Sequence, residues 1–494
     1  MSAVVTTPDT TPDPLIDATA LRHTPLPLLP KIAYSAGSFV DAVTNNVLTV
    51  FGLFYVTAVC GVSGASAGVA LSAGLVVDAI LDPLIGSISD GWRSRLGRRL
   101  PFMMLGLPLS MIAFVMIFSL PKGVPASTLF VTLLLLSVML RVSVSLFNLP
   151  FLALGAELTD DYAERSRVAA WRWGLGMIGG LATVLIGFGL FFKGPDGLGQ
   201  KSAYTPFAMT CAAVAIAGAL AAMWGTFVLR DRAHPIAANR PGWLRALLAG
   251  LVEIFRNRSF RVLFSSSVLF FVAQGVALSL GLHANTYFWR LSGDGIKVVM
   301  LAYFCGLLAG APLIGMFAHL FDKKRMLLIS LGILIVTQAL PASLRLMGLL
   351  NMEGMPLAIV LAANAAIGGL GLTAAAIAVS SMLADAADEH EYLFGSRREG
   401  LYFAGWAFAG KVATGGGALI AGLVLQFSGF PSGAAANAGA QVALRPETVT
   451  LLGLCYGPGA ALFSIAGVLI LLLYRLDRPT HARILKQLIQ QRAG

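Results

Sequence analysis

Long apolar stretches recur along this chain of 494 residues and leave the fold little choice. Most hold roughly 20 or more residues, which is the length of an α-helix that crosses the hydrocarbon core of a bilayer. Because 57% of the residues are hydrophobic, 12% are charged and the mean hydropathy is +0.80, the chain is too apolar for a soluble globular protein. The sequence therefore predicts an all-α polytopic membrane protein. We expect about twelve spans, at residues 32–60, 64–88, 101–120, 125–156, 167–192, 203–229, 259–289, 297–320, 326–349, 354–384, 400–427 and 450–474.

The longest basic connection, residues 230–258, separates the first six expected spans from the last six. Two such halves with a site between them near the midplane are typical of alternating-access transporters. An amphipathic stretch, Trp243 to Phe255, would lie on the cytoplasmic surface beside the connection. The predicted division is a disordered cytoplasmic tail (1–30), an N-terminal half (31–230), a cytoplasmic linker with the amphipathic segment (231–258), a C-terminal half (259–475) and a cytoplasmic tail (476–494).

Basic residues gather in alternate loops between the expected spans. The loops after the second and eighth spans hold Arg93, Arg95, Arg98 and Arg99, and Lys323, Lys324 and Arg325. By the positive-inside rule, both termini are then cytoplasmic and the protein lies in the cytoplasmic (inner) membrane. The net charge of +11 sits in short loops and therefore does not indicate a nucleic-acid partner. The four cysteines lack metal-site spacing, and the N-terminal residues do not form a signal peptide.

Two aspartates, Asp78 and Asp82, interrupt the apolar second span and are followed at once by Pro83. Their spacing places both carboxylates on one helix face, roughly 6 Å apart. An ionised aspartate at mid-membrane costs roughly 2.5–3.5 kcal/mol, so such residues usually face a pathway or a partner. Pro83 also leaves a carbonyl near Ala79 without its donor. A cation is the natural partner, and the alternative is a structural bridge to neighbouring basic residues.

Further charged and polar side chains are expected inside the membrane. Lys411 in the eleventh span needs a counter-charge, Arg141 lies near the middle of the fourth, and Arg172 is flanked by tryptophans in the fifth. With Asp78 and Asp82, the three bases could form a network that exchanges partners as a cation enters. Alternatively, Lys411 only neutralises one aspartate, Arg141 is a structural bridge, and Arg172 reaches the interface.

The loop after the second span carries Asp90, Arg98 and Arg99. Asp90 can cap a neighbouring helix or pair with a base, and the arginines stay on the cytoplasmic side. Such a cluster can act as a gate that breaks when the two halves rock against each other. The alternative is that the arginines only fix the topology.

Four motifs together resemble one known family. They are Asp78-x3-Asp82-Pro83 through Asp90 and Gly97-Arg98-Arg99-x-Pro101; Asn148-Leu-Pro-Phe-x-Ala-Leu-Gly-Ala-Glu157; Glu164-Arg165-Ser166-Arg167 running to Arg172; and Met382-Leu-Ala-Asp385 through Arg397-Arg398-Glu399-Gly400-Leu-Tyr-Phe403 to Lys411. On these motifs the chain resembles the glycoside/pentoside/hexuronide:cation symporters, the family of melibiose permease in the major facilitator superfamily.

The resemblance implies that Asp78 and Asp82 bind the coupling cation, that Lys411 interacts with this site, and that Arg172 contacts substrate. In the family's galactoside transporters, acids in helices one and four hold sugar hydroxyls. Here Asn148 stands at the helix-four place and Asp41 is displaced by about one residue in helix one. Leu152 replaces an aromatic side chain, and Gly91 stands where many members have arginine. The animal lysophospholipid carriers look like the same family, so an amphiphilic substrate is an alternative.

The sequence thus predicts a major facilitator fold of twelve helices and a cation-coupled symporter that moves a sugar or glycoside-like solute. Asp41, Asn148 and Arg172 are the expected substrate contacts, and Na+ or H+, with Li+ as a further choice, is the expected coupling ion. We expect a monomer in contact with membrane lipid, without a cofactor or another metal. The alternatives are a lysophospholipid transporter and a non-transporting membrane assembly factor. No enzyme is expected, since no nucleophile with a nearby base, metal cluster or phosphate loop is evident.

Overall fold

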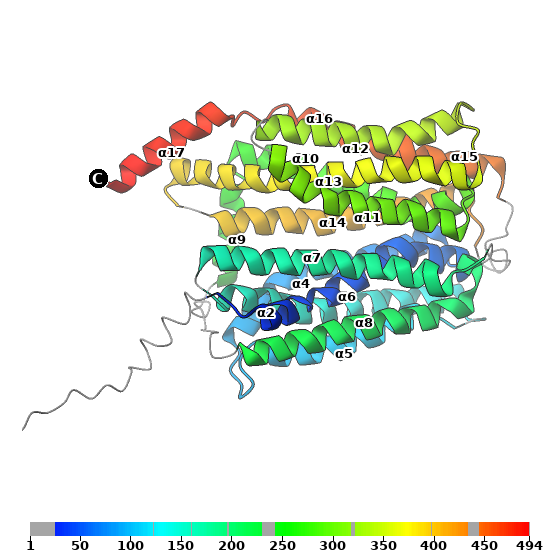
Figure 1. The fold of residues 1–494 in the computed structure, drawn as a ribbon, viewed down its shortest axis with the longest axis horizontal. Helices are drawn as coiled ribbons and strands as arrows, with labels where there is room; N and C mark the ends of the chain where they lie inside the picture. The colour runs from blue at the N-terminus through cyan, green and yellow to red at the C-terminus, as the bar shows by residue number, and fades with distance from the viewer. Residues whose placement is uncertain are drawn as a thin grey trace, which may run out of the picture.

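The regular structure of the chain is entirely helical over the residues that the computed structural model describes, 25–121, 123–159, 161–194, 197–229, 243–317, 322–396, 398–432 and 444–493 (Figure 1). The long helices are α4 (Gly64–Gly91), α5 (Leu100–Ile117), α6 (Ala126–Glu157), α7 (Tyr162–Ile186), α8 (Lys201–Val228), α10 (Arg258–His283), α11 (Gly293–Phe317), α12 (Lys323–Leu346), α13 (Gly354–Phe394) and α14 (Glu399–Phe427). The shorter ones are α2 (Leu28–Ser35), α3 (Ser38–Val47), α9 (Trp243–Ile254), α15 (Pro446–Leu454), α16 (Ala460–Leu471) and α17 (Arg478–Ala493).

Within the described ranges, five short π-helical segments extend or join these helices: η1 (Leu48–Gly52), η2 (Tyr55–Val59), η3 (Gly187–Phe191), η6 (Ala284–Phe288) and η9 (Cys455–Gly459). A 3₁₀ turn, η4 (Gly197–Gly199), precedes α8.

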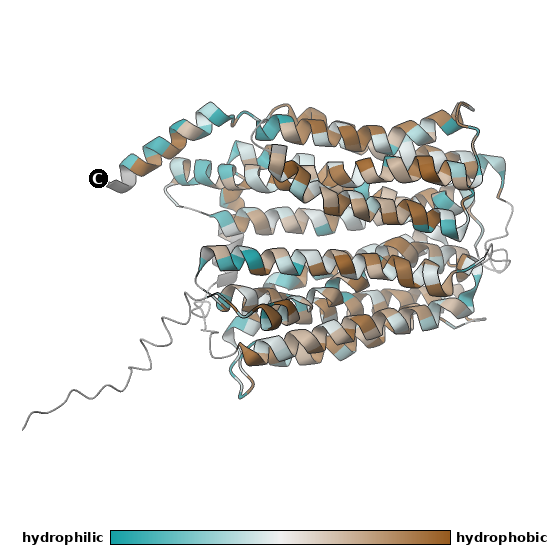
Figure 2. Ribbon diagram, viewed as in Figure 1, coloured by the Kyte–Doolittle hydropathy of each residue, from teal (hydrophilic) through white to brown (hydrophobic). Residues whose placement is uncertain are grey.

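Eleven helical segments are long and apolar enough to cross a membrane in the part of the chain that is described. Figure 2 shows their apolar lengths between more polar ends. The first expected span is broken, because α2, α3, η1 and η2 follow one another from Leu28 to Val59 with a turn at Ala36 and Gly37. Twelve membrane spans are reached only if this composite segment also crosses the membrane. The number of twelve therefore stays a prediction.

Several boundaries differ from those expected. α2 begins at Leu28 and Leu26 is already buried, so the predicted tail over residues 1–30 extends too far. Residues 1–24 of that tail and 230–242 of the linker region lie outside the described residues. α13 continues to Phe394, ten residues past the predicted span end at 384. The amphipathic linker stretch does form a helix, α9.

The helices lie alongside one another in a bundle with two distinct ends. The loop between α4 and α5, the linker helix α9 and the C-terminal helix α17 all lie at one end, on the left of Figure 1. This end carries the arginines of the α4–α5 loop, and we call it the basic end. The opposite end is called the distal end.

The two halves of the chain meet where α4 packs antiparallel against α14. A Cβ atom on Gly422 would lie 2.3 Å from the carbonyl oxygen of Gly64, and one on Gly64 would lie 2.4 Å from the carbonyl oxygen of Gly422. Only glycine allows two backbones to approach so closely. Nearer the basic end, Gly415 faces Ser72 and Leu75. The halves are therefore closed against each other at the distal end.

Replacing Gly422 should break this contact. We expect Gly422→Val to lower the stability of the purified protein by about 1–3 kcal/mol, because the added side chain overlaps the backbone of α4. The measurement is the thermal unfolding midpoint in detergent. Gly416→Val on the same helix is the matched control, since nothing lies within 4 Å of a Cβ at Gly416. Equal midpoints for the two variants would contradict the close contact.

Candidate functional site

A charged cluster lies at the contact between the two halves. Lys411 of α14 reaches across to α4, where its Nζ atom lies 2.8 Å from Asp78 Oδ2 and also pairs with Asp82 Oδ2. The Ser145 hydroxyl of α6 lies 2.7 Å from Asp82 Oδ1 and also contacts Asp78 Oδ1. One lysine from the C-terminal half thus bridges two carboxylates of the N-terminal half. The sequence placed these three charged residues together correctly, but it gave no sign of Ser145.

The antiparallel packing of α4 and α14 explains why these side chains meet. Gly64 and Gly68 contact Gly422 in the turns near the distal end. From this contact, about three turns back along α14 lead to Lys411, and about three turns forward along α4 lead to Asp78. Because the helices are antiparallel, the two charges lie at the same level of the bundle. Asp78 is buried, while 34% of the Lys411 side chain and 21% of the Asp82 side chain remain exposed. The cluster is therefore partly accessible to a small ion.

Arg141 of α6 connects this cluster to the first helix. It donates a hydrogen bond to Asn45 Oδ1, and Asn45 Nδ2 donates to Asp41 Oδ1 at 2.6 Å. The buried guanidinium also interacts electrostatically with Asp78. Three carboxylates, of Asp41, Asp78 and Asp82, thus stand against two cations, Arg141 and Lys411. If all five groups are ionised, one negative charge is unbalanced, which favours the entry of a cation.

No hydrogen bond or ion pair joins Arg172 or Asn148 to the charged cluster among the described residues. The Arg172 guanidinium donates to the Leu152 carbonyl at 3.3 Å and lies 5.7 Å from the Phe151 ring centre, so it packs against α6. The half-buried Asn148 side chain is on α6, three residues beyond Ser145. Neither residue lines the pocket described below. Their expected roles in substrate binding stay predictions.

The residues of the predicted gate loop pair within one half. Arg99 lies 2.5 Å from Asp90 and 3.0 Å from Glu157, and Arg98 lies 2.7 Å from the same Glu157 oxygen. These contacts join α4, the α4–α5 loop and α6, all of the N-terminal half. These contacts of the described residues therefore stabilise one half, and the gate role of the loop stays a prediction. Glu157 is the partner that the loop sequence alone could not identify.

A second polar cluster attaches α17 to the C-terminal half at the basic end. His481 Nε2 lies 3.1 Å from Asp388 and 3.6 Å from Asp385, and Lys323 lies 2.7 Å from Asp385. One ligand atom from each of His481, Asp388 and Asp385 falls within 4.8 Å of the others, a spacing that a metal ion could use. Because Lys323 already neutralises Asp385, the contacts account for the docking of α17 without an ion.

The distal end is closed by aromatic side chains around a buried histidine. His283 of α10 is hydrogen bonded through Nε2 to the Thr57 hydroxyl of η2 at 2.8 Å. Its ring lies 5.1 Å from that of Phe54 in the N-terminal half and 5.3 Å from that of Phe430 in the C-terminal half. This contact supplements the glycine packing of α4 and α14.

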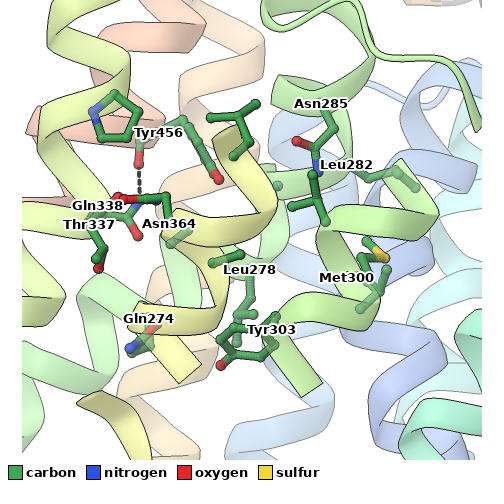
Figure 3. Close-up of a pocket in the computed structure, with 18 of the residues that line it drawn as sticks. Gln274, Leu278, Leu282, Asn285, Met300, Tyr303, Thr337, Gln338, Asn364 and Tyr456 are labelled. Atoms are coloured by element: carbon green, nitrogen blue, oxygen red, sulfur yellow. Dashed lines mark hydrogen bonds between the residues drawn. The ribbon is translucent and has the colours of Figure 1, made fainter. Parts of the chain in front are cut away.

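A pocket lies mainly within the C-terminal half, between α10, α11, α12 and α13 (Figure 3). Tyr456 of η9 and Ser464 of α16 also line it. The N-terminal half contributes Asn46, Val50 and Val184 to its wall. Among the described residues, Asn46 Nδ2 donates to the Gly180 carbonyl at 3.0 Å and to the Thr183 hydroxyl at 2.5 Å. The sequence did not predict this pocket, because its polar residues are scattered over several helices.

Comparison with known proteins gives a family match over residues 33–478, described as MFS/sugar transport protein. An uncharacterized symporter of Synechocystis is 26% identical and is aligned over 93% of this chain and 96% of its own length. The glucuronide carrier protein homolog of Escherichia coli is 27% identical over 81% and 83% of the two chains. The crystal structure of the nucleoside transporter NupG superposes with a TM-score of 0.59 at 14% identity, covering 90% of this chain and 100% of that one. This last similarity bears on the fold alone.

The ion pairs of Lys411 predict a non-additive mutant series. Lys411→Ala leaves the buried Asp78 carboxylate and the half-buried Asp82 carboxylate without their cation. Breaking a fully buried pair costs about 3–5 kcal/mol, and the loss here should be smaller because 34% of the Lys411 side chain is exposed. We expect Lys411→Ala combined with Asp82→Asn to recover part of the unfolding temperature lost by Lys411→Ala alone. The exposed pair of Lys297 and Asp294, 2.7 Å apart, serves as the control, and Lys297→Ala should change nothing measurable. Strict additivity at Lys411 and Asp82 would exclude the contact.

Proposed function

Because the chain belongs to the MFS/sugar transport protein family, we propose that it is a cation-coupled symporter that moves a sugar or glycoside-like solute by alternating access. The observation that carries the proposal is the position of Lys411 between Asp78 and Asp82. The lysine belongs to one half and the aspartates to the other. A change in this cluster therefore acts directly on the contact between the halves.

Coupling follows from competition for the two carboxylates. Na+ prefers oxygen ligands, and Asp78, Asp82 and Ser145 offer oxygens from α4 and α6. A cation bound there would weaken the hold of Lys411 on the aspartates and so change the relative free energies of the two conformations. Protonation of one aspartate would have the same electrostatic effect. Na+ and H+ are thus both compatible with the proposed mechanism.

The conformation described here would be open toward the cytoplasm if the basic end is cytoplasmic, as the positive-inside rule predicts. The distal ends of α4 and α14 are in backbone contact, whereas nothing lies within 4 Å of a Cβ at Gly86, nearer the basic end. Phe408 of α14, one turn before Lys411, is likewise exposed. The proposal places the protein in the inner membrane with both termini on the cytoplasmic side.

The solute would bind between the halves on the basic side of the distal closure. Asp41 and Asn45 of α3 offer a hydrogen-bonded polar edge there. Asn148 can hold a hydroxyl through its amide, and Arg172, whose Nη1 donates to the Leu152 carbonyl, is suited to a carboxylate or phosphate. A family relative described as a glucuronide carrier homolog supports a sugar as the solute class.

Coupling is tested by removing the carboxylate charges. We expect Asp78→Asn and Asp82→Asn each to abolish accumulation driven by an imposed Na+ or H+ gradient, while passive equilibration of the solute persists. The measurement is uptake of labelled sugars and glycosides into proteoliposomes, with and without each gradient. Asp294→Asn, which changes an exposed aspartate, is the control and should retain accumulation. Full gradient-driven accumulation by the Asp78→Asn, Asp82→Asn double variant would refute the proposal.

A further inference from the structure

The pocket of the C-terminal half has a wall without formal charge. Of the described residues that line it, none is an aspartate, glutamate, lysine, arginine or histidine. Its polar groups are the amides of Asn46, Gln274, Asn285, Gln338 and Asn364 and the hydroxyls of Tyr303, Thr337, Tyr456 and Ser464. In a chain that places five charged side chains in the network beside α4, this neutrality separates the pocket from the charged cluster.

Two of the amides lack a hydrogen-bond partner within the described part of the chain. The side chain of Asn285 lies on η6 with only 7% of the residue exposed, and Gln274 lies three turns earlier on α10. Both line the pocket, Asn285 at the upper right and Gln274 at the lower left of Figure 3. Asn285 is buried and Gln274 is half-buried, and an amide without a partner in the protein needs one from water or a ligand. These two amides can therefore hydrogen bond to water in the pocket and to a ligand that replaces the water.

The amides that α12 and α13 contribute to the pocket are held in place by the protein. Asn364 Nδ2 donates to the Thr337 carbonyl at 2.9 Å, and Gln338 Nε2 donates to the Tyr456 carbonyl at 2.5 Å. One N–H of each amide is engaged, which fixes the orientation of the side chain and leaves its carbonyl oxygen as an acceptor beside the second N–H. Groups of this kind suit the hydroxyl groups of a solute. Fixed amides on α12 and α13 and unpaired amides on α10 and η6 make a site that is partly ordered before a ligand binds.

Apolar side chains cover the space between the polar groups. Leu278 and Leu282 of α10 face the pocket, as do Met300 and Phe304 of α11. A mainly apolar lining with a few placed polar groups is typical of sites for small organic molecules. The lining therefore fits a molecule with hydroxyl groups on one part and an apolar surface on another.

We propose that this pocket selects neutral glycosides: Gln274 and Asn285 bond the sugar hydroxyls, Leu278, Leu282 and Met300 contact an apolar aglycone, and anionic sugars are rejected. The proposal rests on the proposed function and specifies the solute class, and it takes this pocket as the binding position in place of the contacts expected at Asn148 and Arg172, which do not line it. Rejection follows because a carboxylate entering this wall would lose its hydration and meet no cation among the lining residues; Arg345, 5.5 Å from the Trp289 ring centre, is not one of them. The preference for neutral solutes is opposite to what the name of the glucuronide carrier relative would suggest.

The test compares matched probes that differ in one group. Binding of the p-nitrophenyl β-glucoside, galactoside, mannoside and xyloside, and of the p-nitrophenyl β-glucuronide and galacturonide, is measured by calorimetry on the full-length protein in nanodiscs. We expect at least one neutral glycoside to bind at least tenfold more tightly than its acid counterpart and than the free sugar. The proposal is wrong if the acid probes bind as tightly as every neutral probe. It is also wrong if no neutral probe binds.

Variants then locate the bound probe. Asn285→Leu and Gln274→Leu should each weaken the best neutral probe about tenfold, because each removes one amide that bonds a hydroxyl. Asn351→Leu and Gln487→Leu make the same changes at exposed positions and should leave binding intact. Unchanged affinity in both pocket variants would overturn the assignment of the site.

A gain of binding guards against variants that only misfold. Gln274→Lys puts a cation in the neutral wall and should tighten the p-nitrophenyl glucuronide relative to the glucoside. If the ratio of glucuronide to glucoside affinity is the same in Gln274→Lys as in the unchanged protein, the charge argument is wrong. The cation coupling can fail separately from the pocket. If the Asp78→Asn, Asp82→Asn double variant still accumulates solute, the coupling proposal is wrong. If neutral glycosides bind as expected in the same protein, the pocket assignment stands.

Discussion

The antiparallel contact of α4 with α14 is the interaction on which the rest of the arrangement depends. Backbone approach at Gly64 and Gly422 fixes how the two helices are aligned, and that alignment brings Lys411 to Asp78 and Asp82. Neither the glycines nor the charges would suffice alone. Without close packing the lysine would have to extend through apolar surroundings unpaired, and without the ion pairs two buried carboxylates would repel each other.

This combination gives the interface two different kinds of contact along its length. Toward the distal end, glycine packing and the aromatic rings around His283 are apolar and insensitive to ions. At the level of Lys411 the contact is electrostatic, so an ion can change it. A cation bound as proposed would therefore act at one level of the interface while the other level keeps the halves aligned. This is the property that a rocking movement about a fixed site requires.

The sequence could predict the charged cluster because an unpaired charge in a membrane is costly, so that Asp78, Asp82 and Lys411 had to find one another. The spans were predictable from apolar length alone, although the break at Gly37 and the extension of α13 to Phe394 were not. Ser145 and Glu157 depend on which helices are neighbours in space, which no local pattern encodes. The pocket was hidden for the same reason, since amides such as Gln274 and Asn364 are common in polar turns of membrane helices and carry no spacing that joins them.

The charged cluster and the neutral pocket are connected through α3 (Ser38–Val47). Asn45 bonds Asp41 and accepts from Arg141, whereas its neighbour Asn46 lines the pocket and bonds the Gly180 carbonyl and Thr183 of α7. Adjacent residues of a helix cannot move independently, because they share one backbone. A solute that displaces Asn46 from α7 would therefore also shift Asn45 against Arg141, which interacts with Asp78. Through these contacts a neutral ligand in the proposed pocket would act on the proposed cation site without touching it, and the two sites would then share a coupling free energy.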